Sequence, residues 1–339
     1  MELYASLDVS MATTAVCVMD TDGEVVAEFS VPSNAGELGI ALTPYRDRLV
    51  LVGLEAGPMS EWITKGLLDQ GFEITQMETR QVNAALSASM VKTDRNDARG
   101  IAKLLRLGWF RPVHVKSETA RERRLLLSAR QSLQNRLIDI DNSIRGLLRC
   151  FGLRPPRYLR GRWDAAIREL IDGHAALTNV IEPMLTVRES LYQGYIALTE
   201  RVKETAHNDP VCRRLMSVPG IGPIVSLTYT ATIDNPERFR SSRQVGAAAG
   251  LTPRRYQSGE MDRAGTITKC GDPMLRTALY EAANVIMVNC KSWFPLRSWA
   301  MRLAARRGPK RAKVALARKL SVILHRMWVD GTEYQARPA

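Results

Sequence analysis

Short apolar strands near the N-terminus, two of which carry an acid near their end, constrain the fold of this chain more than any other feature. Residues 4–10 alternate between apolar and polar side chains as a half-buried strand does, and residues 12–32 continue as a meander. Asp8 therefore lies near the end of the first strand. A later run, Leu49-Val-Leu-Val-Gly-Leu-Glu55, is apolar up to its last residue, as in a strand covered on both faces. Glu55 thus ends a central strand before a Gly-Pro turn.

Two further acids follow in a predicted helix. Thr93 is a good N-cap, and the residues after it predict a helix from Asp94 to about Leu107. The i,i+3 spacing places the carboxylates of Asp94 and Asp97 on the same side of its first turn. Acids in this position also complement the helix dipole, so these two alone would be explained as capping residues. Asp8 is harder to explain, because a carboxylate near the end of an apolar strand is costly without a partner such as a metal ion.

The acids taken together predict a metal site. The set consists of Asp8, Glu55, Asp94 and Asp97. An RNase H-like domain would bring these four side chains together, and their oxygens are the hard ligands that suit Mg²⁺ or Mn²⁺. Two such ions about 4 Å apart can stabilise both the attacking and the leaving oxygen at a phosphate. The sequence therefore predicts an N-terminal α/β domain that cuts phosphodiester bonds.

Composition limits the alternatives. With 339 residues, of which 45% are apolar, the chain can bury a sizeable core in two or three domains. Its five cysteines form no Cys-x-x-Cys pair, which indicates reduced thiols, not a disulfide framework or a zinc site. The N-terminus lacks a signal-peptide pattern, and no stretch stays apolar for the roughly 18 residues that span a membrane. We therefore expect a cytoplasmic protein with no membrane partner.

Charge is distributed unevenly along the chain. Residues 1–116 carry 11 Lys and Arg against 15 Asp and Glu, whereas the remainder carries 37 against 20. Between Ala282 and Val329 there are 11 basic residues and no acid, with four aromatic residues interleaved, as befits a surface that binds phosphates and bases. A solvated basic helix is the alternative, although such a helix normally includes compensating acids. The residues that we expect to contact nucleic acid here are Arg306, Arg307, Lys310 and Arg311.

Two long helical patterns lie between the acidic and the basic part. Their apolar residues follow heptad seams, which predict an antiparallel coiled-coil pair. The first seam comprises Leu126, Leu133, Leu137, Ile140, Ile144 and Leu147, and the second comprises Leu177, Val180, Met184, Val187, Leu191, Tyr195, Leu198 and Val202.

A glycine-rich turn at residues 217–223, Ser-Val-Pro-Gly-Ile-Gly-Pro, follows the second helix. It resembles a helix-hairpin-helix element, whose exposed amides can hold a phosphate, although a plain turn between two helices has the same pattern. We therefore divide the chain into an α/β domain at 1–116, a helical coiled-coil region at 117–208 and a mainly helical domain at 209–339.

One serine in the C-terminal part is surrounded by cations in the sequence. Ser258 stands in the segment 250–271, and five basic residues lie near it: Arg254, Arg255, Arg263, Lys269 and Arg276. A Ser-Gly pair is often an inert turn. A hydroxyl among cations can, however, attack a phosphate, because those charges stabilise the transition state. Beside the acidic set, a second catalytic element is the better explanation.

The order of these motifs resembles one known family along nearly the whole chain. The motifs are Leu-Asp8-Val-Ser, Gly-Leu-Glu55-Ala-Gly, Lys-Thr-Asp94-Arg-Asn-Asp97-Ala-Arg, Pro-Gly-Ile-Gly, Gly-Leu-Thr-Pro with the later Ser258-Gly, and Gly-Thr-Ile-Thr-Lys-Cys-Gly with the later Leu-Arg. This set is similar to that of the DEDD transposases of insertion sequences, the IS-one-ten family, and of the related Piv-like site-specific DNA invertases. One departure is mild: the family commonly has a small residue after the first acid, where this chain has Val9-Ser10.

The resemblance implies a RuvC-like domain that holds Mg²⁺ or Mn²⁺ through the four acids, and a transposase domain whose nucleophile matches Ser258. It implies that double-stranded DNA, both donor and target, is cut and rejoined through a covalent phosphoserine, with the metal stabilising the 3′ oxygen. It also implies a structured non-coding guide RNA that pairs with the DNA. Finally, it implies a homo-oligomer, a dimer or tetramer, in which the acids of one subunit work beside the serine of another.

Three other functions stay open. A RuvC-like, structure-selective endonuclease needs only the four acids and would act by metal-dependent hydrolysis without Ser258. Sugar kinases and actin-like ATPases share the RNase H-like fold, but their first phosphate loop usually has glycine where Val9 and Ser10 stand. A non-catalytic DNA- or RNA-binding protein would explain the basic half and leave the acids unused.

Overall fold

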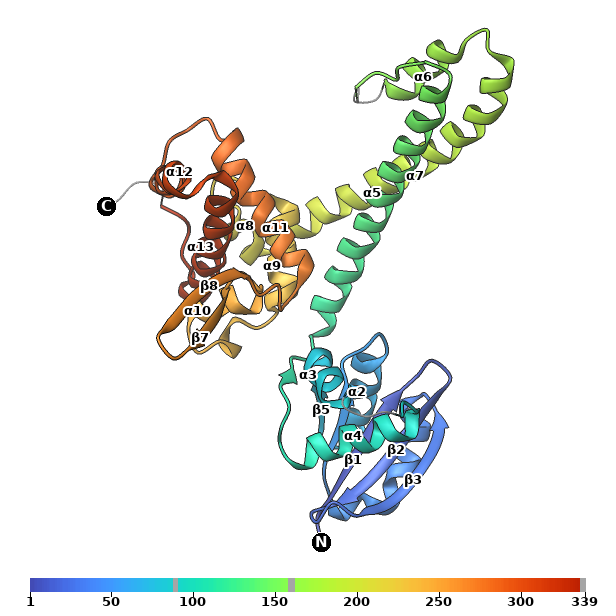
Figure 1. Ribbon diagram of the computed structural model, residues 1–339, viewed down its shortest axis with the longest axis vertical. Helices are drawn as coiled ribbons and strands as arrows, with labels where there is room; N and C mark the ends of the chain where they lie inside the picture. The colour runs from blue at the N-terminus through green and yellow to red at the C-terminus, as the bar shows by residue number, and fades with distance from the viewer. Residues whose placement is uncertain (88–90, 158–161, 336–339) are drawn as a thin grey trace. The chain divides into compact units, whose positions relative to one another are not determined.

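The computed structural model describes residues 1–87, 91–157 and 162–335 of the chain (Figure 1). It divides into two compact units, Met1–Lys116 and Ser117–Ala339. Within the described residues, no helix combines the length and the apolar character needed to cross a membrane. All five cysteines are free thiols, as their spacing predicts.

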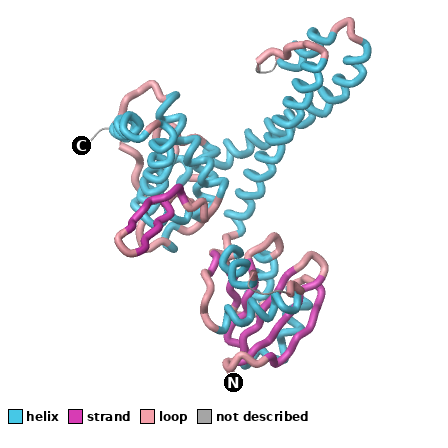
Figure 2. The backbone as a smooth tube through the Cα atoms, in the orientation of Figure 1, coloured by secondary structure: helices cyan, strands magenta, loops and turns pink. Residues whose placement is uncertain are grey.

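The first unit is built on one six-stranded sheet, drawn in magenta in Figure 2. The strands are β1 (Leu3–Val9), β2 (Thr13–Asp20), β3 (Val25–Pro32), β4 (Leu49–Glu55), β5 (Ile74–Met77) and β6 (Pro112–Val113). They lie in the order β3-β2-β1-β4-β5-β6. The first three form an antiparallel meander, whereas β4 runs parallel to both β1 and β5. The predicted meander and the predicted central strand are both confirmed.

Helices cover both faces of this sheet. They are α1 (Ala35–Leu42), the 3₁₀ turn η1 (Thr43–Arg48), α2 (Ser60–Asp69), α3 (Thr79–Leu86) and α4 (Asp94–Arg106). Leu7 and Leu54 of the sheet pack with the side chains of α1 and α2 on one face. Met77 packs with Ile101 and Leu105 of α4 on the other face. Because both faces are covered, β1 and β4 are mostly apolar, as buried strands are.

Two small residues let α4 lie close against the sheet. A Cβ atom on Gly53 of β4 would come within 2.8 Å of Leu105 Cδ1, so the leucine side chain of α4 packs directly against the backbone of the strand. The buried hydroxyl of Ser6 in β1 donates a hydrogen bond of 2.6 Å to the carbonyl oxygen of Ala98. Both contacts fix the position of α4 relative to β1 and β4, the two strands that carry acids.

The second unit begins with two long helices that run back along each other. These are α5 (Glu118–Cys150) and α7 (Ala175–Asn208), and the short helix α6 (Trp163–Ile171) packs at their far end. Their contact does not follow the predicted heptads throughout. Val180 and Val187 are each 54% exposed, whereas Ile181 and Leu185 are fully buried. The buried stripe of α7 is therefore shifted by one residue in this part of the helix.

The remaining helices form a separate cluster with one β-hairpin. They are α8 (Pro210–Leu215), α9 (Pro223–Ile233), the 3₁₀ turn η2 (Pro236–Arg238), α10 (Ser242–Ala248), α11 (Pro273–Asn284), the π-turn η3 (Val285–Asn289), α12 (Pro295–Arg307) and α13 (Pro309–Asp330). The hairpin consists of β7 (Pro253–Ser258) and β8 (Met261–Ile267). A core that includes Tyr229, Leu279 and Leu320 joins α9, α11 and α13.

Candidate functional site

Two of the predicted acids lie side by side at one edge of the sheet. Leu7 of β1 is paired with Leu54 of the parallel strand β4, so Asp8 and Glu55 follow at the same level. Side chains alternate along a strand, and Leu7 and Leu54 both face α1 and α2. The carboxylates of Asp8 and Glu55 therefore point toward the face that α4 covers.

The other two acids enter this region from α4. The helix begins at Asp94, and the hydroxyl of Thr93 accepts a hydrogen bond of 3.2 Å from the amide of Asn96, so the predicted cap is confirmed. Asp94 and Asp97 both lie in the first turn of the helix. The N-terminal end of α4 carries a partial positive charge that favours acids here.

The acids act on one another electrostatically. Burial raises the pKa of Asp8 from its ordinary value of 3.8 to about 6, and the negative charges of Asp97, Asp94 and Glu55 add to this rise. Burial also raises the pKa of Glu55, with Asp97 adding to it, while a hydrogen bond with Thr79 opposes the rise. The positive charge of Lys92 lowers the pKa of both carboxyls. Ionising Asp8 and Glu55 at this edge is therefore costly unless a cation binds there.

The four carboxylates do not converge into a formed metal site. Within the described residues, no three His, Cys, Asp or Glu side chains converge closely enough to hold a metal ion. The chemistry of the donor set nevertheless fits a divalent cation, because every member is a hard oxygen ligand. A bound cation would require the carboxylates to move toward one another.

Glu28, which was not among the predicted site residues, anchors α4 to the sheet. Glu28 of β3 accepts hydrogen bonds from Arg95 and Arg99, including one of 2.8 Å from Arg99 Nη2. The hydrogen bond from Arg99 lowers the pKa of Glu28 to about 2. The signal in the sequence is the i,i+4 pair of arginines between and after the acids of α4, which calls for an acidic partner.

Ser258 lies in the second unit at the tip of the β7–β8 hairpin. It is the last residue of β7, it is paired with Met261 across the turn, and it is exposed. Gly259 follows with a φ of 55°, which glycine adopts readily. The segment that carries Ser258 is therefore a two-stranded hairpin, with the Ser-Gly pair at its turn.

The five basic residues predicted to surround Ser258 lie at different positions on and beside the hairpin. Strand alternation and pairing put Arg263 on the same hairpin face as Ser258, while Arg255 is on the other face and pairs with Asp262 at 2.7 Å. Arg276 of α11 donates to the backbone carbonyls of Ala249 and Lys269, so it braces the base of the hairpin. Arg254 belongs to β7, and Lys269 lies just after β8.

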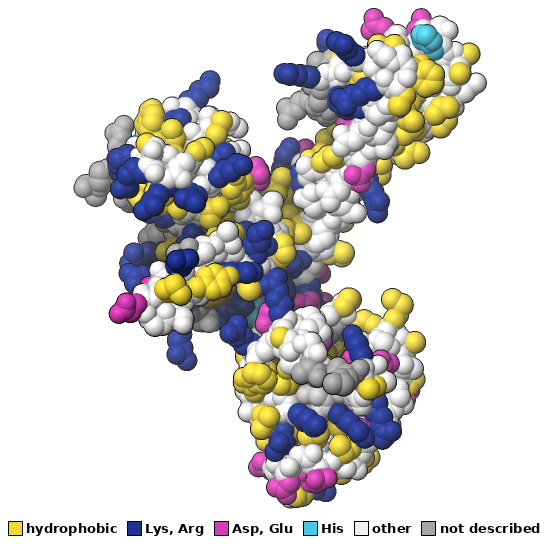
Figure 3. Space-filling view, in the orientation of Figure 1, with side chains coloured by type: hydrophobic (Ala, Val, Ile, Leu, Met, Phe, Trp, Pro, Cys, Tyr) yellow, Lys and Arg dark blue, Asp and Glu magenta, His cyan; other side chains and the backbone are white. Residues whose placement is uncertain are grey.

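The predicted basic surface is divided between two helices. Arg306 and Arg307 lie in the last turn of α12, and Lys310 and Arg311 lie in the first turn of α13, with Gly308 between them at a φ of 82°. All four basic side chains are exposed. Lys and Arg side chains gather over these helices in Figure 3.

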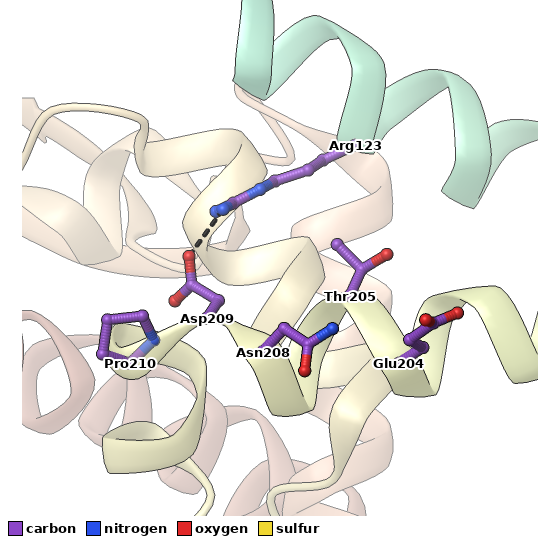
Figure 4. A pocket seen from close by; sticks show the side chains of 6 residues that line it. All are labelled: Arg123, Glu204, Thr205, Asn208, Asp209 and Pro210. Carbon is purple, nitrogen blue, oxygen red and sulfur yellow. Dashed lines mark hydrogen bonds and ion pairs between the residues drawn. The ribbon is translucent and has the colours of Figure 1, made fainter.

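A recess of about 440 Å³ between α5, α7 and α8 carries none of these motifs (Figure 4). Arg123 of α5 reaches across it and forms an ion pair of 2.5 Å with Asp209, which also caps α8 by accepting from the amide of Cys212. This contact joins the long helices to the C-terminal cluster, so the recess has a structural explanation.

Comparison with known proteins decides the family. A family model described as a transposase, of the DEDD IS110 type, matches residues 5–152, which include all four acids. A second model, the transposase IS116/IS110/IS902 family, matches residues 212–298, which include Ser258. The chain belongs to this transposase family.

Relatives of this chain occur in several bacteria. The transposase for insertion sequence element IS1111A of Coxiella burnetii is 32% identical over 69% of this chain and 65% of its own length. A probable family 20 transposase of Pseudomonas aeruginosa is 28% identical over 81% of this chain and 82% of its own length. The chain thus spans slightly less than two thirds of the first of these relatives.

Among solved structures, the Thermus thermophilus RuvC structure aligns with 33% of this chain and 99% of its own, at 15% identity and a TM-score of 0.27. The fold of the N-terminal unit follows from its own sheet. An antiparallel β1-β2-β3 meander continued by parallel β4 and β5, with helices on both faces, agrees with the RNase H-like fold predicted for this unit.

Proposed function

We propose that this protein is the DNA transposase of a mobile insertion sequence, which cuts DNA strands and rejoins them. The observation that carries the proposal is the placement of the four acids: the pairing of β1 with β4 sets Asp8 beside Glu55, and Asp94 and Asp97 lie in the first turn of α4. Burial raises the pKa of Asp8, and the charges of the other three acids add to this rise, which would not be expected for a solvated acid. The exposed serine of the β7–β8 hairpin supplies a nucleophile in the other unit.

The acid cluster would hold Mg²⁺ or Mn²⁺ through Asp8, Glu55, Asp94 and Asp97. When bound, such an ion would stabilise negative charge on the departing and returning 3′ oxygen of the DNA. The chain itself orients the ligands. Glu28 fixes α4 through Arg95 and Arg99, and the parallel pairing of β1 with β4 keeps Asp8 beside Glu55.

The serine would conserve the energy of the broken bond. The Oγ atom of Ser258 attacks the phosphorus, the bond from Oγ to phosphorus forms, and the bond from phosphorus to the 3′ oxygen breaks. The serine loses its proton and the 3′ oxygen gains one, so the strand end stays linked to the protein as a phosphoserine ester. Attack by the 3′ hydroxyl of another strand reverses these changes. Arg263, on the same hairpin face, supplies positive charge for the phosphate.

The proposal extends to partners and domain organisation. The net charge of +17 beyond residue 116 supports binding of double-stranded DNA and of a structured non-coding guide RNA. We propose a dimer or tetramer in the cytoplasm, with domains at 1–116, 117–208 and 209–339 and a coiled-coil pair in the middle.

We also propose that residues 217–223 form a helix-hairpin-helix-like turn. Gly220 in this turn has a φ of 89°, and a Cβ atom there would lie 2.6 Å from Ile286 Cγ1, so close packing favours glycine at this position.

Substitution of the acids tests the proposal. Each of four changes, Asp8→Ala, Glu55→Gln, Asp94→Ala and Asp97→Ala, should abolish Mg²⁺-dependent strand cleavage and leave the circular dichroism spectrum unchanged, because each removes an oxygen ligand from the surface of the unit. The change Asp69→Ala, at the exposed end of α2, is the matched control and should cleave like the parent. Near parental cleavage by two of the four variants would show that the cluster is wrongly assigned.

The alternative is a RuvC-like endonuclease that hydrolyses DNA with the acid cluster alone. It is favoured by one observation, that the four acids lie in a unit with its own core. This enzyme would not need Ser258, so the same acid variants would be inactive while a Ser258→Ala variant stayed fully active.

A further inference from the structure

A long groove runs along α13 in the C-terminal cluster. Its volume is about 1200 Å³, above the range typical of small-molecule pockets. One wall is the stripe of α13 from Lys310 to Val322, and the other is formed by Gly265, Thr266 and Ile267 of β8 with the segments beside the hairpin. The second wall therefore belongs to the hairpin that carries Ser258.

The charge of the groove has one sign. Among the residues that the structure describes, six basic ones and no acid line it; the six are Arg243, Lys269, Lys310, Arg311, Arg318 and Lys319. All six are exposed. On α13 the basic residues form two rows: Lys310 with Arg311, and Arg318 with Lys319 eight residues later. Eight residues correspond to about 12 Å along a helix. Between the two cationic rows, Val314 and Ala315 face the same groove. Phosphates at both rows and apolar groups between them would match this pattern.

The floor of the groove is apolar and includes an aromatic ring. Leu251, Ile267, Val314 and Val322 line it together with Trp299 of α12. Trp299 is half-buried, and Lys319 Nζ lies 4.3 Å from the centre of its ring. A purely electrostatic surface for a duplex has no need of such a floor, because the bases of a duplex are stacked inside it. Unpaired bases, in contrast, gain from aromatic and apolar contact.

The rim of the groove is held in a special backbone conformation. Lys269 has a φ of 55°, which is uncommon for a residue with a side chain. Its amide donates to the carbonyl of Gly250 at 3.1 Å, and its carbonyl accepts from Arg276 Nη1 at 3.2 Å. The surrounding contacts thus fix a lysine at the rim at a cost in backbone energy, as is common where a protein contacts a ligand.

We propose that this groove binds an unpaired stretch of DNA next to the hairpin that carries Ser258. The cations along α13 contact successive phosphates, and the bases lie against Trp299 and the apolar floor. The inference rests on the proposed function, since a strand that is cut at the hairpin must leave its duplex there. It adds Arg243, Arg318, Lys319 and Trp299 to the residues that contact nucleic acid.

Binding of a labelled oligothymidylate of about 12 nucleotides to the full-length protein tests the proposal, measured by fluorescence anisotropy. The groove pair Arg311→Gln with Arg318→Gln is compared with the control pair Lys313→Gln with Arg326→Gln, which removes equal charge from α13 outside the groove. The groove pair should weaken oligothymidylate binding at least about tenfold more than the control pair. Binding of the same sequence as a duplex should fall to a similar extent with both pairs.

A second comparison isolates the stacking contact. Trp299→Leu should weaken oligothymidylate binding at least about fivefold, whereas Trp299→Phe should retain most of it. Trp293→Leu is the control, because Trp293 is 65% exposed, outside the groove, and also contacts an arginine, with Arg297 Cζ 4.5 Å from its ring centre. If Trp299→Leu is unfolded by circular dichroism, the phenylalanine variant and the charge pairs still decide the outcome.

Three results would overturn the proposal. Equal loss of oligothymidylate binding by the groove pair and the control pair would show a general charge effect. A greater loss of duplex binding would make the groove a duplex site, and tighter, groove-dependent binding of oligouridylate would make its occupant RNA. Covalent adduct formation by the parent protein is scored in parallel. If the groove pair weakens oligothymidylate binding but the parent forms no covalent adduct, the serine mechanism is refuted and the groove proposal stands. If the parent forms the adduct but the groove pair binds oligothymidylate like the control pair, the groove proposal is refuted and the serine mechanism stands.

Discussion

Asp8 is a carboxyl whose ionisation depends strongly on its surroundings. Its pKa of about 6 is set by burial and by three neighbouring acids, and Lys92 opposes them. Only the ionised form of a carboxyl binds a divalent cation well. At this residue the protonation state and the metal site are therefore coupled.

We expect Mg²⁺-dependent cleavage to rise with pH and to reach half of its maximum near pH 6 when Mg²⁺ is scarce, because Asp8 then loses its proton. More Mg²⁺ should move this midpoint to lower pH, since the cation competes with the proton. The pH profile at two Mg²⁺ concentrations measures both effects. A midpoint that ignores Mg²⁺ would separate Asp8 from the metal site.

The same shift affects stability in a defined direction. The folded-state pKa of Asp8 lies above its ordinary value of 3.8, so the folded protein binds this proton more tightly than the unfolded chain does. Without metal, the free energy of unfolding should fall as pH rises from about 4 to about 6. Asp8→Asn should remove this decline and stabilise the metal-free protein at neutral pH by about 1 kcal/mol, since water screens the half-exposed carboxyl. Thermal unfolding with chelator present gives the comparison.

At the scale of secondary-structure elements, α4 decides how the site is assembled. It carries two acids in its first turn, and two arginines anchor it to β3 through Glu28. The sequence predicted this helix because its cap and its acids are local signals. It did not predict Glu28, because a partner 67 residues away in sequence appears only once the sheet is formed.

Glu28→Gln should loosen α4 without removing any predicted metal ligand. We expect a several-fold higher Mg²⁺ concentration for half-maximal cleavage and a loss of about 1 kcal/mol or less in stability, as for a solvent-screened ion pair. The control is Glu182→Gln, which breaks the ion pair of 2.7 Å with Arg168 in the other unit. Unchanged Mg²⁺ dependence in Glu28→Gln would show that α4 holds its place without this anchor.

The long helices show where sequence patterns mislead. Apolar spacing favoured Val180 and Val187 for the seam of α7, but Arg188 takes a buried position instead. Its guanidinium donates to Asp141 and Asp164, each at 2.6 Å, and it lies 4.6 Å from the ring centre of Trp163. A buried arginine is tolerated only because these partners, which come from α5 and α6, compensate for the loss of water. A heptad pattern contains no information on such partners.

At the scale of the whole molecule, the acidic set and the cationic surface belong to separate units, and the proposed cutting and rejoining of DNA requires both. The sequence identified the residue types and their order, since four acids and a serine among cations are visible in one dimension. The pairing of Arg255 with Asp262 and the bracing role of Arg276 are not visible there. They depend on the hairpin register, which is set by tertiary contacts.

Binding to DNA or RNA should weaken steeply with salt, because the second unit carries the net positive charge. Neutralising Arg306, Arg307, Lys310 and Arg311 together should flatten the slope of log affinity against log salt by up to roughly 0.7 to 0.9 for each phosphate that these side chains neutralise. A variant neutralised at Arg136, Arg149, Arg201 and Lys203 on the long helices removes the same charge elsewhere. An identical slope in the parent and the first variant would mean that these four residues do not contact phosphate.

The most direct test of the central claim is the covalent link between Ser258 and DNA. End-labelled DNA with the ends of the element is incubated with protein and Mg²⁺, and adducts are read on a denaturing gel. The parent and the control Ser292→Ala should form the adduct, whereas Ser258→Ala should form none, rejoin no strands and unfold at the same temperature, since it loses one exposed oxygen. Mixing Ser258→Ala with Asp8→Ala protein should restore some adduct if subunits share a site. Cutting and rejoining by Ser258→Ala at the parental level would contradict the account and leave a metal-dependent nuclease.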